Sequence, residues 1–183
     1  MKKLLPISVE DFERIAPRLS PCELVKGEII PMSPGHFKHS RVTMNIAFVL
    51  EAYARRTKTG RILTNEAGMV VKKDLDTVRG GDVVFISYKR LPAARTYKGF
   101  LRIAPELVVG VLGEDDTWKD LEEKTEEYRS FGVDMVWVVD PKTLSVRLYP
   151  RRGEPYVLHE KDEISGGKIL PGFSCGVSEF FVD

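Results

Sequence analysis

The sequence has few of the features that mark membrane, secreted or metal-cluster proteins. It contains two cysteines, Cys22 and Cys175, which form neither a metal-binding motif nor a disulfide framework. No apolar run approaches the roughly 18 residues that a membrane-spanning helix needs. The segment before Pro6 is too short for a signal peptide. We therefore expect a protein of the reducing cytoplasm that does not enter a membrane.

The sequence also lacks a large net charge, internal repeats and low-complexity segments. Its 183 residues carry a formal net charge of +1, with 43% hydrophobic and 30% charged residues. This length is enough for one domain with a hydrophobic core that needs neither a metal nor disulfides to hold it. No stretch has the composition of a linker, so residues 1–183 are expected to form a single α/β domain.

Charge is nevertheless unevenly distributed along the chain. Residues 55–102 contain 12 Lys or Arg and 4 Asp or Glu, whereas residues 103–134 contain 3 and 10. The basic segment has the charge needed to follow a nucleic-acid backbone. Lysines on sheet edges and loops, with acids on an exposed helix face, would give the same pattern. The composition leaves both interpretations open.

The first half of the chain shows patterns of alternating helices and strands. Ser8 and Asp11 have the spacing of a capping box, and the helix that they begin must end near Pro17. Gly27 supplies the positive φ of a hairpin turn. Hydrophobic periodicity then distinguishes a long helix from two strands. The predicted elements are a helix, a hairpin, a helix and two strands, over residues 8–17, 23–30, 36–58, 62–71 and 82–87.

The second half is predicted to contain a strand–helix–strand unit and two meander strands, over residues 106–112, 115–131, 133–139, 143–149 and 155–159. The first of these strands is almost continuously apolar, which is typical of a central strand covered on both faces. The helix has one apolar face and one acidic face, with Glu127 on the acidic face. Trp118, Tyr128, Phe131 and Trp137 are expected in the core. The two strands that flank the helix should be parallel.

Two charged residues stand where a ligand could bind. Lys124 lies about 40° from Leu121 and Tyr128 around its helix, at the edge of the face that packs on the sheet. A lysine there either extends to solvent or binds an anion. Asp82 begins an apolar strand after two glycines, and strand ends in α/β folds commonly bind ligands. The alternative is that Asp82 is a turn residue without a role in binding.

The order of these features resembles that of a known protein family. Six stretches carry the resemblance and follow one another over residues 23–34, 77–87, 105–112, 124–128, 132–141 and 170–173. Through them the sequence resembles the Uma family of restriction-endonuclease-like proteins, within the PD-(D/E)XK nuclease superfamily. The resemblance covers nearly the whole chain and implies an α/β fold, restriction-endonuclease-like, with a central mixed β-sheet flanked by α-helices.

The resemblance also implies a metal-dependent nuclease site. Asp82 would bind a divalent cation, Mg²⁺ or Mn²⁺, and Lys124 would orient the attacking water or neutralise the scissile phosphate. Glu66 and His39 match further polar positions of the family's catalytic pocket. Glu23 matches the acid that opens the hairpin. DNA is the expected partner, and a homodimer is a further expectation.

One position departs from the family pattern. The family's strand reads Val-Val-Glu-Val-Leu-Ser, whereas residues 108–113 read Val-Val-Gly-Val-Leu-Gly, so Gly110 replaces the second metal-binding carboxylate. The backbone carbonyl of Val111 is an implied metal ligand beside it. Glu106 lies about 13 Å away along the strand, at about 3.3 Å per residue, and cannot substitute. Metal binding is therefore expected to be weakened, since loss of even a supporting partner commonly costs about 10–100-fold.

Gly110 could instead serve the conformation of its strand. Close approach of another backbone or a β-bulge would each require a glycine, and the glycine could also be an engineered substitution. An acid from the following loop, Glu114 or Asp116, could replace the missing ligand. The sequence thus predicts a Mg²⁺-dependent DNA endonuclease that is inactive or impaired. The alternatives are a non-catalytic nucleic-acid-binding or regulatory module and a protein-interaction scaffold.

Overall fold

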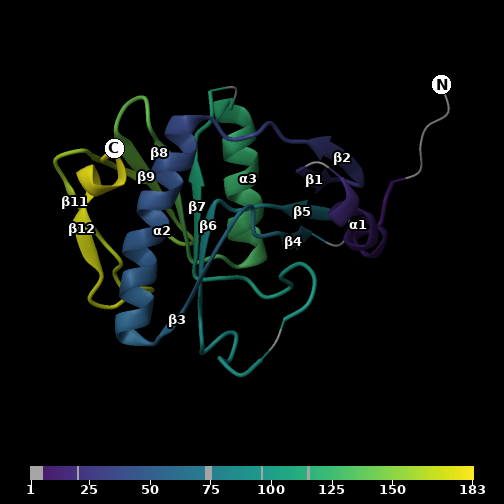
Figure 1. Ribbon diagram of the computed structural model, residues 1–183, viewed down its shortest axis with the longest axis horizontal. Helices are drawn as coiled ribbons and strands as arrows, with labels where there is room; N and C mark the ends of the chain where they lie inside the picture. The colour runs from purple at the N-terminus through teal and green to yellow at the C-terminus, as the bar shows by residue number, and fades with distance from the viewer. Residues whose placement is uncertain (1–5, 20, 73–75, 96, 115) are drawn as a thin grey trace.

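A six-stranded mixed sheet forms the centre of the molecule (Figure 1). The computed structural model describes residues 6–19, 21–72, 76–95, 97–114 and 116–183. The sheet has the order β10-β9-β8-β7-β6-β3, and only β7 and β8 are parallel neighbours. Its strands are β3 (Gly60–Thr64), β6 (Val83–Ser87), β7 (Leu107–Val111), β8 (Met135–Asp140), β9 (Ser145–Pro150) and β10 (Tyr156–His159).

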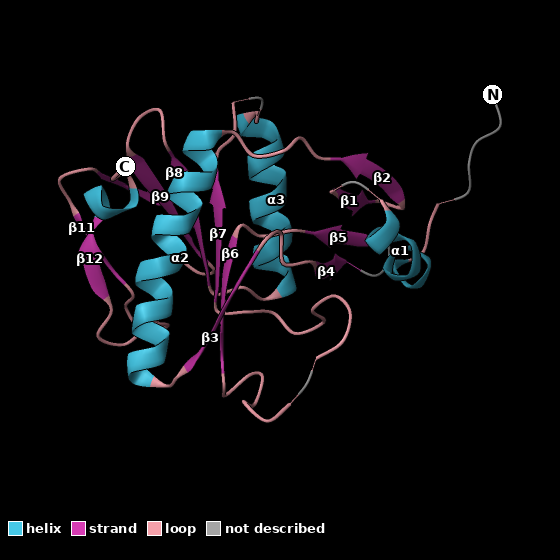
Figure 2. Cartoon of the chain, in the orientation of Figure 1, coloured by secondary structure: helices cyan, strands magenta, loops and turns pink. Residues whose placement is uncertain are grey.

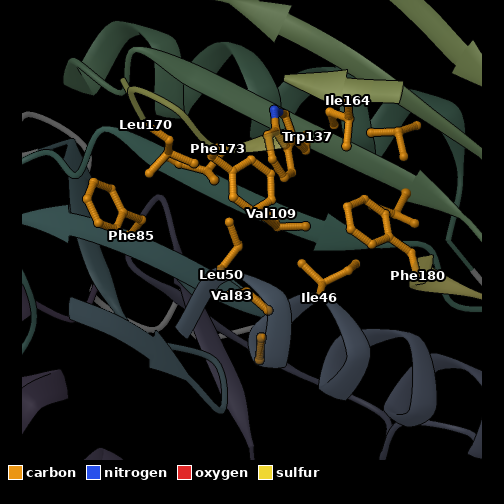
Figure 3. Close-up of a cluster of buried hydrophobic side chains, with 14 of the residues drawn as sticks. Ile46, Leu50, Val83, Phe85, Val109, Trp137, Ile164, Leu170, Phe173 and Phe180 are labelled. Atoms are coloured by element: carbon orange, nitrogen blue, oxygen red, sulfur yellow. The ribbon is translucent and has the colours of Figure 1, made fainter. Parts of the chain in front are cut away.

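Helices α2 (Phe37–Thr57) and α3 (Trp118–Phe131) cover opposite faces of this sheet (Figure 2). The α2 face is completed by β11 (Glu163–Ser165), β12 (Ser174–Gly176) and the 3₁₀ helix η2 (Val177–Phe180). Figure 3 shows Ile46 and Leu50 of α2 beside Val109 and Trp137 of the sheet, within the same cluster as Phe180. This burial explains why the central strands are apolar on both faces.

A second, four-stranded sheet was not predicted. It has the order β2-β1-β5-β4 and carries α1 (Val9–Ile15), which is followed by the 3₁₀ helix η1 (Ala16–Arg18). Its strands are β1 (Cys22–Val25), β2 (Glu28–Pro31), β4 (Met69–Lys72) and β5 (Thr77–Arg79). The β1–β2 hairpin is confirmed, with Gly27 at φ 78°. Strand β5 was missed, because three residues carry too little periodicity to be recognised.

The single strand predicted over residues 62–71 is wrong. The chain turns at Asn65 and Glu66, both at positive φ (61° and 55°), so β3 ends in the six-stranded sheet and β4 begins in the other. The local sequence is apolar on both sides of this turn, and hydrophobic pattern alone therefore does not reveal it. The turn matters because it places Glu66 at the junction of the two sheets.

Helix α3 begins later than predicted. Thr117 is its N-cap and accepts a hydrogen bond from Asp120 N at 3.2 Å, while the predicted start at Asp115 lies outside the described residues.

The aromatic residues predicted in the core are not all buried. Trp118 is 51% exposed, so its predicted core position is wrong; Arg147 lies over its ring at 5.0 Å. Tyr128 and Trp137 are buried as predicted, and Phe131 is partly buried. No helix in the described ranges is long and apolar enough to cross a bilayer.

Candidate functional site

Asp82 and Gly110 lie opposite each other where the pairing of β6 and β7 ends. The last paired residues are Val83 and Val109, and one further step of this antiparallel register joins Asp82 to Gly110. The Asp82 carboxylate Oδ2 accepts a hydrogen bond of 2.7 Å from the backbone N–H of Val111. Opposed residues in a sheet point to the same face. A side chain at position 110 would therefore stand beside Asp82.

Gly110 is required by neither a bulge nor a close backbone approach. The parallel register of β7 with β8 runs without a shift from Leu107 to Val111. A Cβ atom built on Gly110 would meet no other atom within 4 Å. The two packing hypotheses for the glycine are therefore wrong. A side chain can therefore begin at this position without a clash at its Cβ atom, and the glycine lacks the carboxylate that the resemblance places there.

His39, near the start of α2, contacts the carboxylate oxygen of Asp82 that does not accept from Val111. Its Nε2 lies 3.2 Å from Asp82 Oδ1, and the two side chains are 20% and 12% exposed. The hydrogen bond from His39 to Asp82 raises the pKa of the imidazole, against the opposing effect of burial. The charges of Glu66 and Asp116 raise the His39 pKa further. Asp82 thus faces a histidine that readily carries a proton.

Glu66 completes a pair of neighbouring carboxyl groups. Burial, followed by the charge of Asp82 and a hydrogen bond to it, raises the Glu66 pKa to about 8, while the charge of Lys124 opposes this rise. The prediction that Glu66 and Asp82 are close, with one pKa raised, is confirmed. Gly80 makes room for Glu66, since a Cβ there would lie 2.4 Å from Glu66 Oε2. Near neutral pH, Glu66 therefore holds a proton beside the Asp82 carboxylate.

Lys124 binds an anion rather than extending freely into solvent. Its Nζ lies 3.2 Å from Oε2 of Glu23, which is almost fully buried on β1. The other Glu23 oxygen, Oε1, accepts a hydrogen bond of 3.0 Å from Gly80 N, two residues before Asp82. Glu23 therefore ties Lys124 of α3 to the turn that carries Asp82. We call Asp82, Glu66, His39, Lys124 and Gly110 the Asp82 site.

A buried arginine that sequence reasoning missed supports Glu23. Arg79 on β5 donates from Nη1 to Glu23 Oε2 at 2.9 Å and from Nε to Glu127 Oε2 at 2.6 Å. The predicted solvent exposure of Glu127 is wrong, because the second sheet covers this side of α3 and Arg79 neutralises the acid. Tyr128 adds a hydrogen bond of 2.5 Å from its hydroxyl to Gly80 O. The only sequence signal was Arg79 beside the Gly-Gly-Asp turn.

Other acids near β7 have separate partners. Glu106 accepts hydrogen bonds from Ser87 N (2.9 Å) and Ser87 Oγ (2.6 Å), four residues along the strand from Gly110. Asp116 accepts one from Gly113 N at 2.7 Å, and its charge is felt at His39. Glu106 thus cannot replace the missing acid, whereas Asp116 lies in the electrostatic neighbourhood of the Asp82 site.

Three arginines of the basic segment form ion pairs within the fold. Arg79 is buried, Arg90 pairs with Glu106 (3.1 Å) and Asp134, and Arg102 pairs with Glu13 (2.8 Å). These three arginines are therefore neither lysines on sheet edges and loops nor free to follow a nucleic-acid backbone, and the choice between the two interpretations stays untested for the rest of the segment.

A family model described as "Uma2: Putative restriction endonuclease" matches residues 9–178. The chain belongs to the Uma2 family. It is also similar to the crystal structure of "a putative nuclease belonging to DUF820" from Anabaena variabilis, with a TM-score of 0.81 and 19% identity, over 96% of this chain and 98% of that chain. This likeness confirms the predicted restriction-endonuclease-like fold. No curated protein matches the chain.

The residues of this Uma2-family chain do not fit the two-carboxylate metal site that the resemblance implies. In the described part of the chain, no group of three or more His, Cys, Asp or Glu side chains is placed to hold a metal ion. Asp82 is occupied by Val111 N–H and His39, and Gly110 offers no side-chain oxygen. Mg²⁺ prefers several hard oxygen ligands. The role of the Val111 carbonyl as a ligand stays a prediction.

Proposed function

We propose that this Uma2-family protein binds DNA at the Asp82 site and that, as it stands, it hydrolyses phosphodiester bonds weakly or not at all. The observation that carries this proposal is the open side-chain position of Gly110 opposite Asp82. The fold and the neighbouring polar groups are retained, while one acid is absent. Binding of Mg²⁺ or Mn²⁺ is proposed to be weak for the same reason.

The remaining side chains have chemistry suited to holding a phosphodiester. Lys124 brings a cation to the site, and its side chain is 30% exposed. The Glu66 pKa is raised to about 8, so near neutral pH Glu66 shares its proton with Asp82 and adds no second negative charge that would repel a phosphate. Glu23, held by Arg79 and Gly80 N, fixes the Lys124 ammonium in place. These groups orient a phosphodiester, but the negative charge of Asp82 repels it. Productive cleavage therefore requires a bound metal ion to offset this charge, and the missing acid weakens the binding of that ion.

The test is digestion of plasmid and oligonucleotide DNA with Mg²⁺ or Mn²⁺. The unmodified protein should show little or no cleavage, and Gly110→Glu should gain metal-dependent cleavage. Gly110→Gln is the matched control, because it has nearly the same volume without the negative charge. Asp82→Ala or Lys124→Ala added to Gly110→Glu should abolish the gain.

Two results would contradict the proposal. Robust cleavage by the unmodified protein that survives Asp82→Ala would place the chemistry in another part of the molecule. A folded Gly110→Glu variant that neither binds metal nor cleaves DNA would show that the missing acid is not what limits activity.

DNA binding is tested separately from cleavage. Fluorescence anisotropy with labelled duplex DNA should show an affinity that falls as salt concentration rises, because lysine–phosphate contacts release counterions. Lys124→Ala should weaken binding and reduce the salt dependence. Binding without cleavage in every variant would favour the non-catalytic module, and no binding at any salt concentration would favour the protein-interaction scaffold.

A further inference from the structure

The outer side of α2 exposes large apolar side chains. Phe37 is 81% exposed, Met44 56% and Phe48 66%, although each lies in a well-formed helix on the outside of the sheet (Figure 1). Large exposed apolar groups gathered on one surface commonly mark an interaction site. They lie on the side of α2 that faces away from the core, so packing within the chain does not account for them.

These residues belong to a regular stripe along the helix. The stripe, which we call the outer seam, advances in alternating steps of four and three residues and consists of Phe37, Arg41, Met44, Phe48, Glu51 and Arg55. This is the spacing with which one helix packs along another in a coiled coil. The core side of α2, formed by Val42, Ile46, Leu50 and Tyr53, lies about half a turn away. The helix thus carries one seam for its own core and a second seam facing solvent.

A hollow lies beside the outer seam. It has a volume of about 560 Å³, and Met44, Phe48 and Ala52 of α2 face Ile62 and Thr64 of β3 across it. Strand β3 is one of the two edge strands of the six-stranded sheet. The hollow can accept a large side chain from a molecule that docks along α2.

We propose that the outer seam binds α2 of a second copy of this chain, with the two helices antiparallel about a two-fold axis level with Ile46. This register brings Met44 against Phe48 of the second copy and Phe37 against Arg55 of the second copy. It also brings Arg41 against Glu51 of the second copy. Each contact occurs twice, as an isologous interface requires. These pairs of residues follow one another along the interface as successive layers, as they do between two antiparallel helices.

Charge complementarity favours a second copy of this chain as the partner of the outer seam. The central layers are apolar, and Arg41 and Glu51 flank them with opposite charges at equal distances from the axis. Among the described residues, no carboxylate forms an ion pair with Arg41, while Glu51 pairs with the exposed Arg55 at 2.6 Å. That exposed pair contributes little and can be exchanged for an intermolecular one. A nucleic acid or an anionic membrane would pair with Arg41 and Arg55 but has no cationic group to match Glu51, which lies inside the seam.

Analytical ultracentrifugation of the full chain tests the proposal. The protein should be dimeric at about 100 µM, where a dimer with a micromolar dissociation constant is nearly complete. Phe48→Glu should make it monomeric under the same conditions. Lys161→Glu, an exposed residue of the β10–β11 turn far along the chain from the seam, is the control and should leave the dimer unchanged. A monomer at this concentration overturns the proposal, as does a dimer that survives Phe48→Glu.

Charge reversal tests the register itself. Arg41→Glu and Glu51→Arg should each raise the dissociation constant by on the order of tenfold, because each places two like-charged pairs across the axis. The double variant should return the dissociation constant to near its original value, since both pairs are restored with reversed polarity. Single variants that leave the dissociation constant unchanged, or a double variant no better than the singles, overturn the antiparallel arrangement. None of these residues belongs to the Asp82 site.

Discussion

The carboxylate of Asp82 closes the β6–β7 ladder by accepting a hydrogen bond of 2.7 Å from the backbone N–H of Val111. This contact holds Asp82 directly beside Gly110, at the point where the resemblance places a pair of acids. Because a Cβ on Gly110 would meet nothing within 4 Å, the change from the family pattern removes charge and leaves packing unaffected. The response of the protein to substitution should therefore depend on this open position and on the buried charges around it.

Gly110 should tolerate a side chain better than other glycines of the sheet. Gly110→Ala is expected to stabilise the protein by about 0.5–1 kcal/mol, because alanine has less conformational freedom to lose on folding. Gly60→Ala is the matched comparison: a Cβ there would lie 2.6 Å from Ile86 O and from the Phe85 ring, so it should destabilise by about 1–3 kcal/mol. Urea unfolding measures both. Equal losses in the two variants would mean that the space at Gly110 is filled.

Metal should stabilise the restored site only. Mg²⁺ is expected to raise the Tm of Gly110→Glu, reversibly on addition of EDTA, because a ligand that binds only the folded state stabilises it. The unmodified protein and Gly110→Gln should show no such shift. Without metal, Gly110→Glu should be less stable than the unmodified protein, since a third carboxyl group joins Asp82 and Glu66. An equal Mg²⁺-induced shift in all three proteins would place the metal elsewhere.

The free energy of unfolding should fall as pH rises from about 4.5 to about 8. The Glu66 pKa is raised from 4.5 to about 8, so over this window the folded protein keeps a proton that the unfolded chain releases. The raised His39 pKa acts in the same direction, because its contribution is lost as pH rises through the folded-state pKa. Glu66→Gln keeps the shape of the protonated acid and should remove the larger part of this pH dependence.

At about pH 8.5, Glu66→Gln should be more stable than the unmodified protein by on the order of 1–3 kcal/mol, and the two should converge towards pH 5. Urea unfolding across this range provides the measurement. Parallel stability curves for the two proteins would show that Glu66 is ionised in the folded state at neutral pH.

Arg79 should be far more important for stability than an exposed arginine. Arg79→Met leaves Glu23 and Glu127 buried without their shared cation and should destabilise the fold by about 3–5 kcal/mol. Arg14→Met removes an exposed ion pair with Asp11 and should change stability by less than about 0.5 kcal/mol. Chemical denaturation compares them. A similar small loss in both would indicate that water reaches the two glutamates.

If Arg79→Met folds, it should also disturb the Asp82 site. Glu23 would lose a partner and hold Lys124 less firmly, so DNA affinity should fall although Arg79 is buried away from solvent. An unchanged affinity would show that Lys124 keeps its position without the arginine.

Local patterns in the sequence predicted the elements that depend on neighbouring residues. Hydrophobic spacing indicated α2, α3 and the strands β6 to β10, and the Lys26–Gly27 turn indicated the first hairpin. The ordered motifs of the family resemblance placed Asp82 beside Gly110, with Lys124 and Glu66 near them, while the catalytic roles of these residues stay predictions. These inferences succeeded because periodicity and turn chemistry act over a few residues, and the motif order carries the register of the strands with it.

Only the tertiary structure decided which charges are buried and what space surrounds them. The short strand β5, the turn at Glu66 and the second sheet depend on pairing between distant segments, which local preference does not specify. That sheet covers one side of α3, so Glu127 is buried against Arg79 although its position on the helix predicted exposure. The open position at Gly110 likewise depends on atoms from other strands and helices. Sequence therefore determined most of the elements and the missing acid, while long-range packing determined the second sheet and the surroundings in which that absence has its effect.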